Sequence, residues 1–165
     1  MQIRKLESKD ANLFREIRLQ ALKQVPEAFA ASYEEEFQEG ISFFESKLLN
    51  KEVFFGLFKE EDKLVGIISL SRSTLLKMQH KAAIGSVFIT KEARGKGFGK
   101  KLFTHVMEKA QAEGIEQLQL VVAAHNDKAK QLYESLGFQL FGLEKRALKV
   151  NGEYIDEEYM MKILR

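Results

Sequence analysis

Apolar residues repeat at α-helical spacing in several stretches of the chain, and each stretch predicts one helix. Ser8 and Asp10 offer caps to the first helix, and Asn126 offers one to the last. Gly114 and Gly137 are suited to helix ends, and a short apolar run at 42–49 predicts one more helix. The apolar faces are Leu13, Phe14, Ile17, Ala21 and Leu22; Leu102, Phe103, Val106, Met107 and Ala110; and Ala129, Leu132, Tyr133 and Leu136.

Other apolar runs predict strands. One strand opens the chain at 1–6, two more lie within 52–73 around a polar turn, and further strands are expected at 80–90 and 117–124. Residues 138–150 and 153–164 predict a hairpin, because Asn151-Gly152 suits the positive φ angles of a type I′ turn. Residues 25–40 show no clean period and are expected to form a long connection. The predicted order, β-α-α-β-β-β-α-β-α-β-β, is that of an α+β fold with a mixed sheet.

Composition narrows the class of protein. The chain has 165 residues, a single proline and no Ser/Gly-rich linker, so we expect one domain over 1–165. A net charge of +2 is too small for a protein that coats nucleic acid. The absence of cysteine excludes disulfides, zinc-thiolate sites and a cysteine nucleophile, and the three histidines show no metal-ligand spacing. No secretory signal or run of ~18 apolar residues is found, so we expect a cytoplasmic protein without membrane partners.

The segment Thr90–Leu102 concentrates glycine and positive charge between a predicted strand and a predicted helix. Glycines let an anion approach the backbone, and the helix N-terminus adds free amides, so the segment predicts a phosphate or pyrophosphate cradle. A Walker A loop is excluded because Leu102 follows Lys100-Lys101 where Ser or Thr is required. A dinucleotide fingerprint is excluded because the spacing is G-x-G-x-G and Gln119 replaces the acidic residue. A solvated glycine-rich turn stays open as an alternative.

A second motif narrows the choice of anion. Residues 94–99 match R/Q-x-x-G-x-G/A, and residues 126–138 match N-x-x-A-x-x-x-Y-x-x-x-G-F. With both motifs, the sequence resembles the GNAT superfamily of acetyl-CoA-dependent N-acetyltransferases. The resemblance is strongest from about Phe54 to Phe138. It implies a mostly antiparallel sheet of six to seven strands flanked by about four helices.

The resemblance also implies roles for individual residues. Backbone amides of the glycine loop would bind the pyrophosphate of acetyl-CoA, and a bulged strand before the loop would pair with the pantetheine arm and supply an oxyanion donor. Tyr133 would be the general acid that protonates the CoA sulfur, although spacing alone favours a core-facing aromatic. A tyrosine pKa of about 10 makes that transfer only modestly uphill. The implied cofactor-binding set is Val87, Phe88, Ile89, Arg94, Gly95, Lys96, Gly97, Phe98, Gly99, Lys100, Asn126, Ala129 and Tyr133, with no metal.

The general base is not identified by the motifs. The strand at 82–90 has no acidic residue, so the glutamate that some family members carry there is missing. Glu34, Glu35 and Glu36 are the candidates, beside a water chain, and a solvated acidic turn is the competing interpretation.

The expected reaction is direct acetyl transfer to a primary amine of a small molecule, peptide or protein. A non-catalytic acyl-CoA sensor and a nucleotide-phosphate binder are the alternatives. The terminal hairpin is a candidate for pairing across a homodimer.

Overall fold

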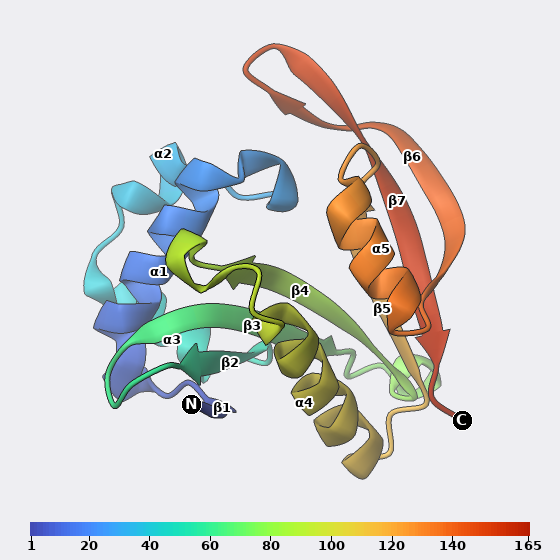
Figure 1. The fold of residues 1–165 in the computed structure, drawn as a ribbon, viewed down its shortest axis with the longest axis horizontal. Coiled ribbons are helices and arrows are strands. Elements are labelled where there is room, and N and C mark those ends of the chain that lie inside the picture. Colours follow the sequence, from blue (N-terminus) through green and yellow to red (C-terminus); the bar gives the residue numbers. More distant parts are fainter.

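The computed structural model describes residues 1–165, and its seven strands form one sheet in the order β1-β2-β3-β4-β5-β7-β6 (Figure 1). All neighbouring strands are antiparallel except β4 and β5. This confirms the predicted α+β fold with a mostly antiparallel sheet. The strands are β1 (Gln2–Lys5), β2 (Val53–Phe58), β3 (Leu64–Arg72), β4 (Lys81–Ile89), β5 (Gln117–Ala123), β6 (Gln139–Val150) and β7 (Glu153–Ile163).

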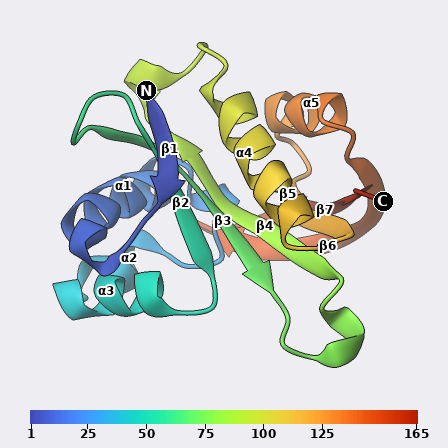
Figure 2. The same ribbon diagram turned by 90° about the horizontal axis from the view of Figure 1, so that it is seen from below.

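Helices cover both faces of the sheet, with α1 to α3 on one side and α4 and α5 on the other (Figure 2). Two hydrophobic clusters correspond to these layers, one centred on Phe14 and Phe44 and one centred on Phe103 and Phe138. None of the helices combines the length and apolar composition needed to span a membrane. The helices are α1 (Ala11–Gln24), α2 (Tyr33–Phe37), α3 (Ile41–Leu49), α4 (Phe98–Ala112) and α5 (Asp127–Ser135), with short 3₁₀ turns at Ser8–Asp10, Pro26–Ala28 (η2), Leu76–Met78 and Lys91–Ala93.

Helix α2 lies inside the segment that we expected to be an irregular connection. Its N-terminus is a capping box, in which the Glu35 amide donates to the Ser32 hydroxyl at 3.2 Å and the Ser32 amide donates to the Glu35 carboxylate at 3.0 Å. A helix of five residues is too short to show a helical period in the sequence. The local S-x-x-E pattern was the only signal that could have revealed it.

Of the two predicted caps of α1, Asp10 occupies the N-cap position, but neither side chain caps the helix. Ser8 begins a 3₁₀ turn, and the Asp10 side chain makes no capping hydrogen bond to α1. The Asp10 carboxylate instead accepts from the Glu7 amide and from both terminal nitrogens of Arg4, each at 2.8 Å. Asp10 therefore connects β1 to the start of α1.

Strand β6 lies at the sheet edge, and its pairing across a homodimer stays a prediction.

Candidate functional site

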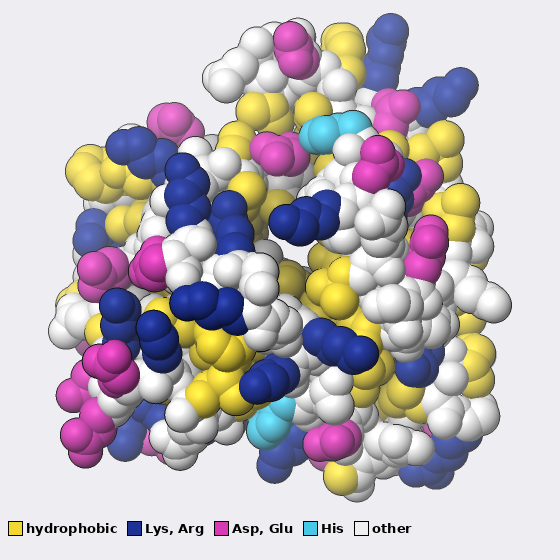
Figure 3. Space-filling model, viewed as in Figure 1, with side chains coloured by type: hydrophobic (Ala, Val, Ile, Leu, Met, Phe, Trp, Pro, Cys, Tyr) yellow, Lys and Arg dark blue, Asp and Glu magenta, His cyan; other side chains and the backbone are white.

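A cavity of about 840 Å³ runs between the end of β4, the N-terminus of α4, strand β5 and helix α5. It has the size of a small-molecule or cofactor site. Figure 3 shows a hollow in the same face of the molecule, with Lys and Arg side chains around its rim. Every residue of the predicted cofactor-binding set except Lys96 lines this cavity.

The glycine loop forms one end of the cavity and is shaped by left-handed backbone. Gly95 has φ 74° and Gly97 has φ 77°, a region that L-residues avoid. Gly97 is the N-cap of α4, and the Lys101 amide makes a helical bond to its carbonyl at 3.2 Å. The amides of Phe98 to Lys100 precede this bond and have no acceptor within the helix. No atom lies within 4 Å of a Cβ built on Gly95 or Gly97, so an anion can approach the backbone here.

The basic side chains of the loop differ in what they contact. Arg94 donates from Nε to the Ile89 carbonyl at 2.9 Å, and its guanidinium lies 5.5 Å from the Phe88 ring centroid. Lys96 donates to the Glu92 carbonyl at 3.2 Å and lies outside the cavity wall. Lys100 is exposed and lines the cavity without such a bond. Arg94 and Lys96 therefore stabilise the loop itself, and Lys100 is the one of the three left free for a ligand.

Strand β4 carries a bulge beside the cavity. The register with β3 shifts so that the single residue Ile68 lies opposite Ser86 and Val87, and Ser86 has φ 50°. A bulge of this kind bends a strand and leaves a residue out of the ladder.

Beyond the bulge, β4 has no partner on its β5 side. The two strands pair only through residues 81–83 and 117–119, and they separate where they reach the cavity. The Thr90 amide donates to the Val65 carbonyl of β3 at 2.9 Å, so the backbone groups of Ile89, one residue earlier, point to the open side. Arg94 takes the Ile89 carbonyl, which leaves the Ile89 amide available to an extended ligand.

A buried ion pair supports the bulge from the α1 to α3 side. Arg18 of α1 donates to Glu36 of α2 through Nε at 2.5 Å and through Nη2 at 2.8 Å, and the two side chains are 6% and 5% exposed. Arg18 also approaches the Ser86 hydroxyl at 3.4 Å. Glu36 is therefore held by Arg18 and is not free to act as a base.

The other two acidic candidates also fail. Glu35 is engaged with Ser32 in the capping box, and its pKa is lowered by the Ser32 hydroxyl and then by the Ser32 amide. Glu34 is exposed, and none of Glu34, Glu35 and Glu36 lines the cavity. A helix cap and an ion pair occupy two of the three candidate carboxylates, and the exposed Glu34 agrees with the competing interpretation of a solvated acidic turn.

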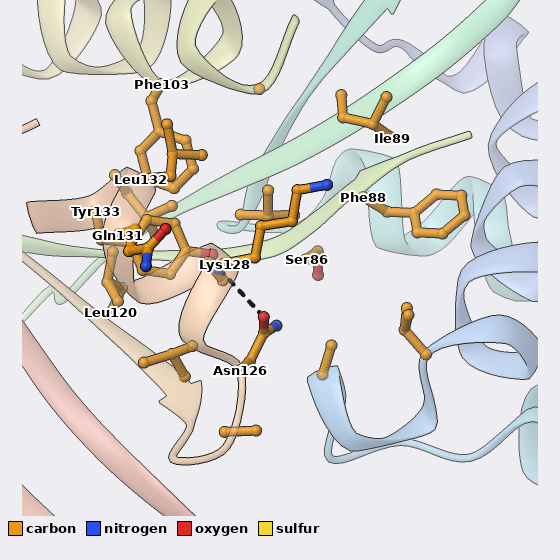
Figure 4. Close-up of a pocket in the computed structure, with 18 of the residues that line it drawn as sticks. Ser86, Phe88, Ile89, Phe103, Leu120, Asn126, Lys128, Gln131, Leu132 and Tyr133 are labelled. Carbon is orange, nitrogen blue, oxygen red and sulfur yellow. Dashed lines mark hydrogen bonds between the residues drawn. The ribbon is translucent and has the colours of Figure 1, made fainter. Parts of the chain in front are cut away.

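Helix α5 presents Tyr133 to the middle of the cavity. The Asn126 side chain caps this helix by accepting from the Ala129 amide at 3.1 Å (Figure 4). Tyr133 is 8% exposed and packs against Phe103 and Phe138, with ring centroids 5.1 and 6.4 Å away. Its hydroxyl has no hydrogen-bond partner in the protein. Burial raises the pKa of Tyr133 to about 12, above the ordinary tyrosine value of 10.0.

Six polar residues of the cavity wall were not predicted: Glu27 of η2, Ser86 of β4, His125, Lys128 and Gln131 around α5, and Glu157 of β7. Figure 4 labels Lys128 and Gln131 among the residues that line the cavity. Their place in the first turns of the helix after Asn126 was a usable signal for them. No local pattern marks Glu27 or Glu157, because only the folded sheet brings η2 and β7 to the cavity.

Comparison with known proteins assigns the chain to a family. Residues 3–159 match the family model described as an acetyltransferase (GNAT) domain. The chain is similar to a GNAT-family acetyltransferase from Streptococcus pneumoniae, with TM-score 0.81, 25% identity and 99% of each chain covered. A phosphinothricin acetyltransferase from Sinorhizobium meliloti, solved in complex with AcCoA, shares the fold with TM-score 0.80 and 23% identity, over 99% of this chain and 88% of that one.

Sequence relatives match over shorter segments. Spermidine N(1)-acetyltransferase of Vibrio cholerae is 29% identical over 112 residues, which are 67% of this chain and 63% of that protein. An uncharacterized N-acetyltransferase of Bacillus subtilis is 39% identical over 61 residues, 37% of this chain and 39% of that protein. The chain thus spans less than two thirds of the length of these two relatives. With the match of the family model along almost the whole chain, this protein belongs to the GNAT acetyltransferase family.

Proposed function

We propose that the protein transfers an acetyl group from acetyl-CoA to a primary amine, directly and without a covalent enzyme intermediate. One observation carries the proposal: a single cavity joins the free amides of α4, the unpaired edge of β4 and the Tyr133 hydroxyl. These are an anion site, a strand-like site and a proton donor, in the order that a pyrophosphate, a pantetheine arm and a thioester require.

The backbone supplies the binding groups. The amides around Gly97 and Gly99 suit the pyrophosphate, and Lys100 is placed to meet a further phosphate. Of the backbone N–H groups near Phe88 and Ile89, the one of Ile89 points to the open edge of β4, where it suits the oxyanion that forms on the thioester carbonyl. Such donors are effective because they are fixed before the reaction begins.

Tyr133 is the proposed acid, and its raised pKa limits how it acts. Transfer from a phenol of pKa about 12 to a thiolate with a thiol pKa of about 8.5 is uphill by about 3.5 units, or roughly 5 kcal/mol. Burial in the same apolar cavity also destabilises a thiolate, which narrows this gap. Tyr133 is therefore expected to donate a hydrogen bond to the sulfur and to release its proton only as the C–S bond breaks.

The acceptor is proposed to be a primary amine on a small molecule. The relatives are named for spermidine, for L-methionine sulfoximine or L-methionine sulfone, and for thialysine N-epsilon acetylation. A thiol-release screen of purified protein with acetyl-CoA and these amines, together with short peptides, tests the assignment. We expect thiol release and an acceptor mass increase of one acetyl group.

Two outcomes decide against the proposal. The cofactor assignment fails if millimolar CoA or acetyl-CoA does not raise the melting temperature. Binding of acetyl-CoA without thiol release across the whole amine panel would instead support a non-catalytic acyl-CoA sensor.

A further inference from the structure

Acetyl transfer needs a group that accepts a proton from the amine, because a primary amine is protonated at neutral pH. That group has to face the cavity in which the thioester is proposed to lie. The cavity wall contains two carboxylates, Glu27 and Glu157, and one imidazole, His125. His125 is exposed in the turn before α5, and Glu27 lies in the three-residue turn η2, whereas Glu157 lies within a paired strand.

The register of the sheet fixes the position of Glu157. It is paired with Ala123 of β5 on one side and with Glu144 of β6 on the other. The next residue, Glu158, forms an ion pair at 3.2 Å with Lys130 of α5. Successive side chains of a strand point to opposite faces, so Glu157 points to the face away from α5. A residue held between two neighbouring strands is well positioned for catalysis.

Tyr133 and Glu157 therefore approach one cavity from different sides of the sheet. Tyr133 comes from α5, Glu157 comes from the opposite face, and the cavity reaches both where β4 and β5 have separated. This arrangement places the proton donor for the leaving sulfur and a carboxylate for the incoming amine on different sides of the site. With two residues, neither side chain has to accept the proton of the amine and also donate a proton to the sulfur.

We propose that Glu157 is the catalytic base, which binds the ammonium group of the acceptor and takes its proton; this rests on the proposed acetyltransferase function. The Glu157 carboxylate makes no ion pair in the protein, whereas Glu36 is bound by Arg18 and Glu158 by Lys130. An unpaired carboxylate beside a cavity is suited to a cationic ligand.

The surroundings of Glu157 strengthen it as a base. Burial, and then the neighbouring Glu144 carboxylate, raise the pKa of Glu157 above its usual range, and a carboxylate of higher pKa accepts a proton more readily. Glu144 is in turn held by the Tyr159 hydroxyl, which donates to it at 2.5 Å. Glu27 of η2 and His125 of the β5–α5 turn are the other titratable groups of the wall on this side.

The proton balance of the reaction closes with these two residues. Glu157 takes one proton from the ammonium, and the neutral amine forms a C–N bond with the thioester carbonyl carbon. The C–S bond then breaks, and Tyr133 gives its proton to the sulfur. The tyrosinate regains a proton from the new amide nitrogen through solvent, and Glu157 releases its proton to solvent. One amide, one thiol and one proton are the products.

The test compares Glu157→Gln with the wild type in thiol release, using the best amine of the screen and a range from pH 6 to pH 10. We expect kcat/KM at pH 7 to fall by at least about 100-fold, as is typical when a general base is removed. The variant should regain activity about tenfold per pH unit up to the pKa of the amine, because the free amine then forms without a base. Acetyl-CoA affinity by calorimetry should not change.

Two further variants distinguish a catalytic role from a structural one. Glu144→Gln removes a like charge, so the acid limb of the pH profile should move to lower pH while turnover at the plateau persists. Glu153→Gln, an exposed position on the same strand, is the matched control and should behave as the wild type.

The possible failures are separable. The proposal is overturned if Glu157→Gln retains more than a tenth of the wild-type kcat/KM at pH 7. It is also overturned if Glu27→Gln or His125→Gln, and not Glu157→Gln, removes the acid limb. If the wild type releases no thiol with any amine, the proposed function fails and the role of Glu157 fails with it.

Discussion

Replacing Glu36 with glutamine tests whether the buried ion pair beneath the β4 bulge stabilises the fold. Glutamine keeps the size of the side chain but removes the charge that faces Arg18. The Arg18 guanidinium would then be buried, at 6% side-chain exposure, without a counter-charge. Breaking one partner of a buried pair costs about 3–5 kcal/mol, because the remaining charge has lost its compensation. An exposed pair costs only about 0–1 kcal/mol, so the two cases are separable.

The expected loss is large enough to measure by two methods. For a chain of this length, 1 kcal/mol corresponds to roughly 2–4 °C in melting temperature, so Glu36→Gln should melt about 6–20 °C below the wild type. With a urea m-value of about 2 kcal/mol/M, the unfolding midpoint should fall by roughly 1.5–2.5 M. Calorimetry and urea titration monitored by circular dichroism check the two figures independently.

The controls separate burial from charge. Glu34→Gln changes an exposed neighbour in the same helix and should alter the free energy of unfolding by less than about 0.5 kcal/mol. The double variant Arg18→Met/Glu36→Leu removes both charges and should be markedly more stable than Glu36→Gln alone. A loss below about 1 kcal/mol for Glu36→Gln, or no recovery in the double variant, would refute the reasoning.

Four other substitutions probe the cradle, the acid and the half-buried pair of Arg4 and Asp10. Gly97→Ala should lower the free energy of unfolding by about 1–2 kcal/mol, because alanine disfavours a φ of 77°. Gly99→Ala should leave the stability of the free protein unchanged but weaken CoA binding. Calorimetry checks the stability and the binding. Tyr133→Phe should lower kcat by about 100-fold with acetyl-CoA affinity unchanged; equal turnover at every pH would contradict its role as the acid. The hydrogen bond from Arg4 is the main cause of the lowered pKa of Asp10. The pair therefore stabilises the fold fully above the unfolded pKa of about 4, and this stabilisation is lost as the pH falls through the folded pKa. Asp10→Asn should therefore lower stability by about 1 kcal/mol at pH 7, and this effect should shrink as the pH falls through the folded pKa of Asp10, as measured by urea titration.

Local features of the chain were readable from the sequence because neighbouring residues determine them. Gly97 and Asn151-Gly152 adopt the left-handed backbone that their composition favours, and Asn126 caps the helix that follows it. The periodic apolar faces identified α1, α4 and α5, and short runs rich in apolar residues identified all seven strands. The short helix α2 escaped because five residues show no period, and Asp10 was misread because its strongest partner, Arg4, lies in another element.

The sequence by itself determined the order of the strands and of the longer helices, since each depends on residues close together in the chain. Its two motifs also predicted the glycine cradle and, through the family resemblance, the candidate acid Tyr133. Only the tertiary structure decided which carboxylates are paired and which are free. Arg18 neutralises Glu36 across 18 positions, while the separation of β4 from β5 opens a path from α5 to Glu157 on the far face of the sheet. The charge state and reactivity of a carboxylate depend on what surrounds it in space, and strand pairing between distant segments creates those surroundings.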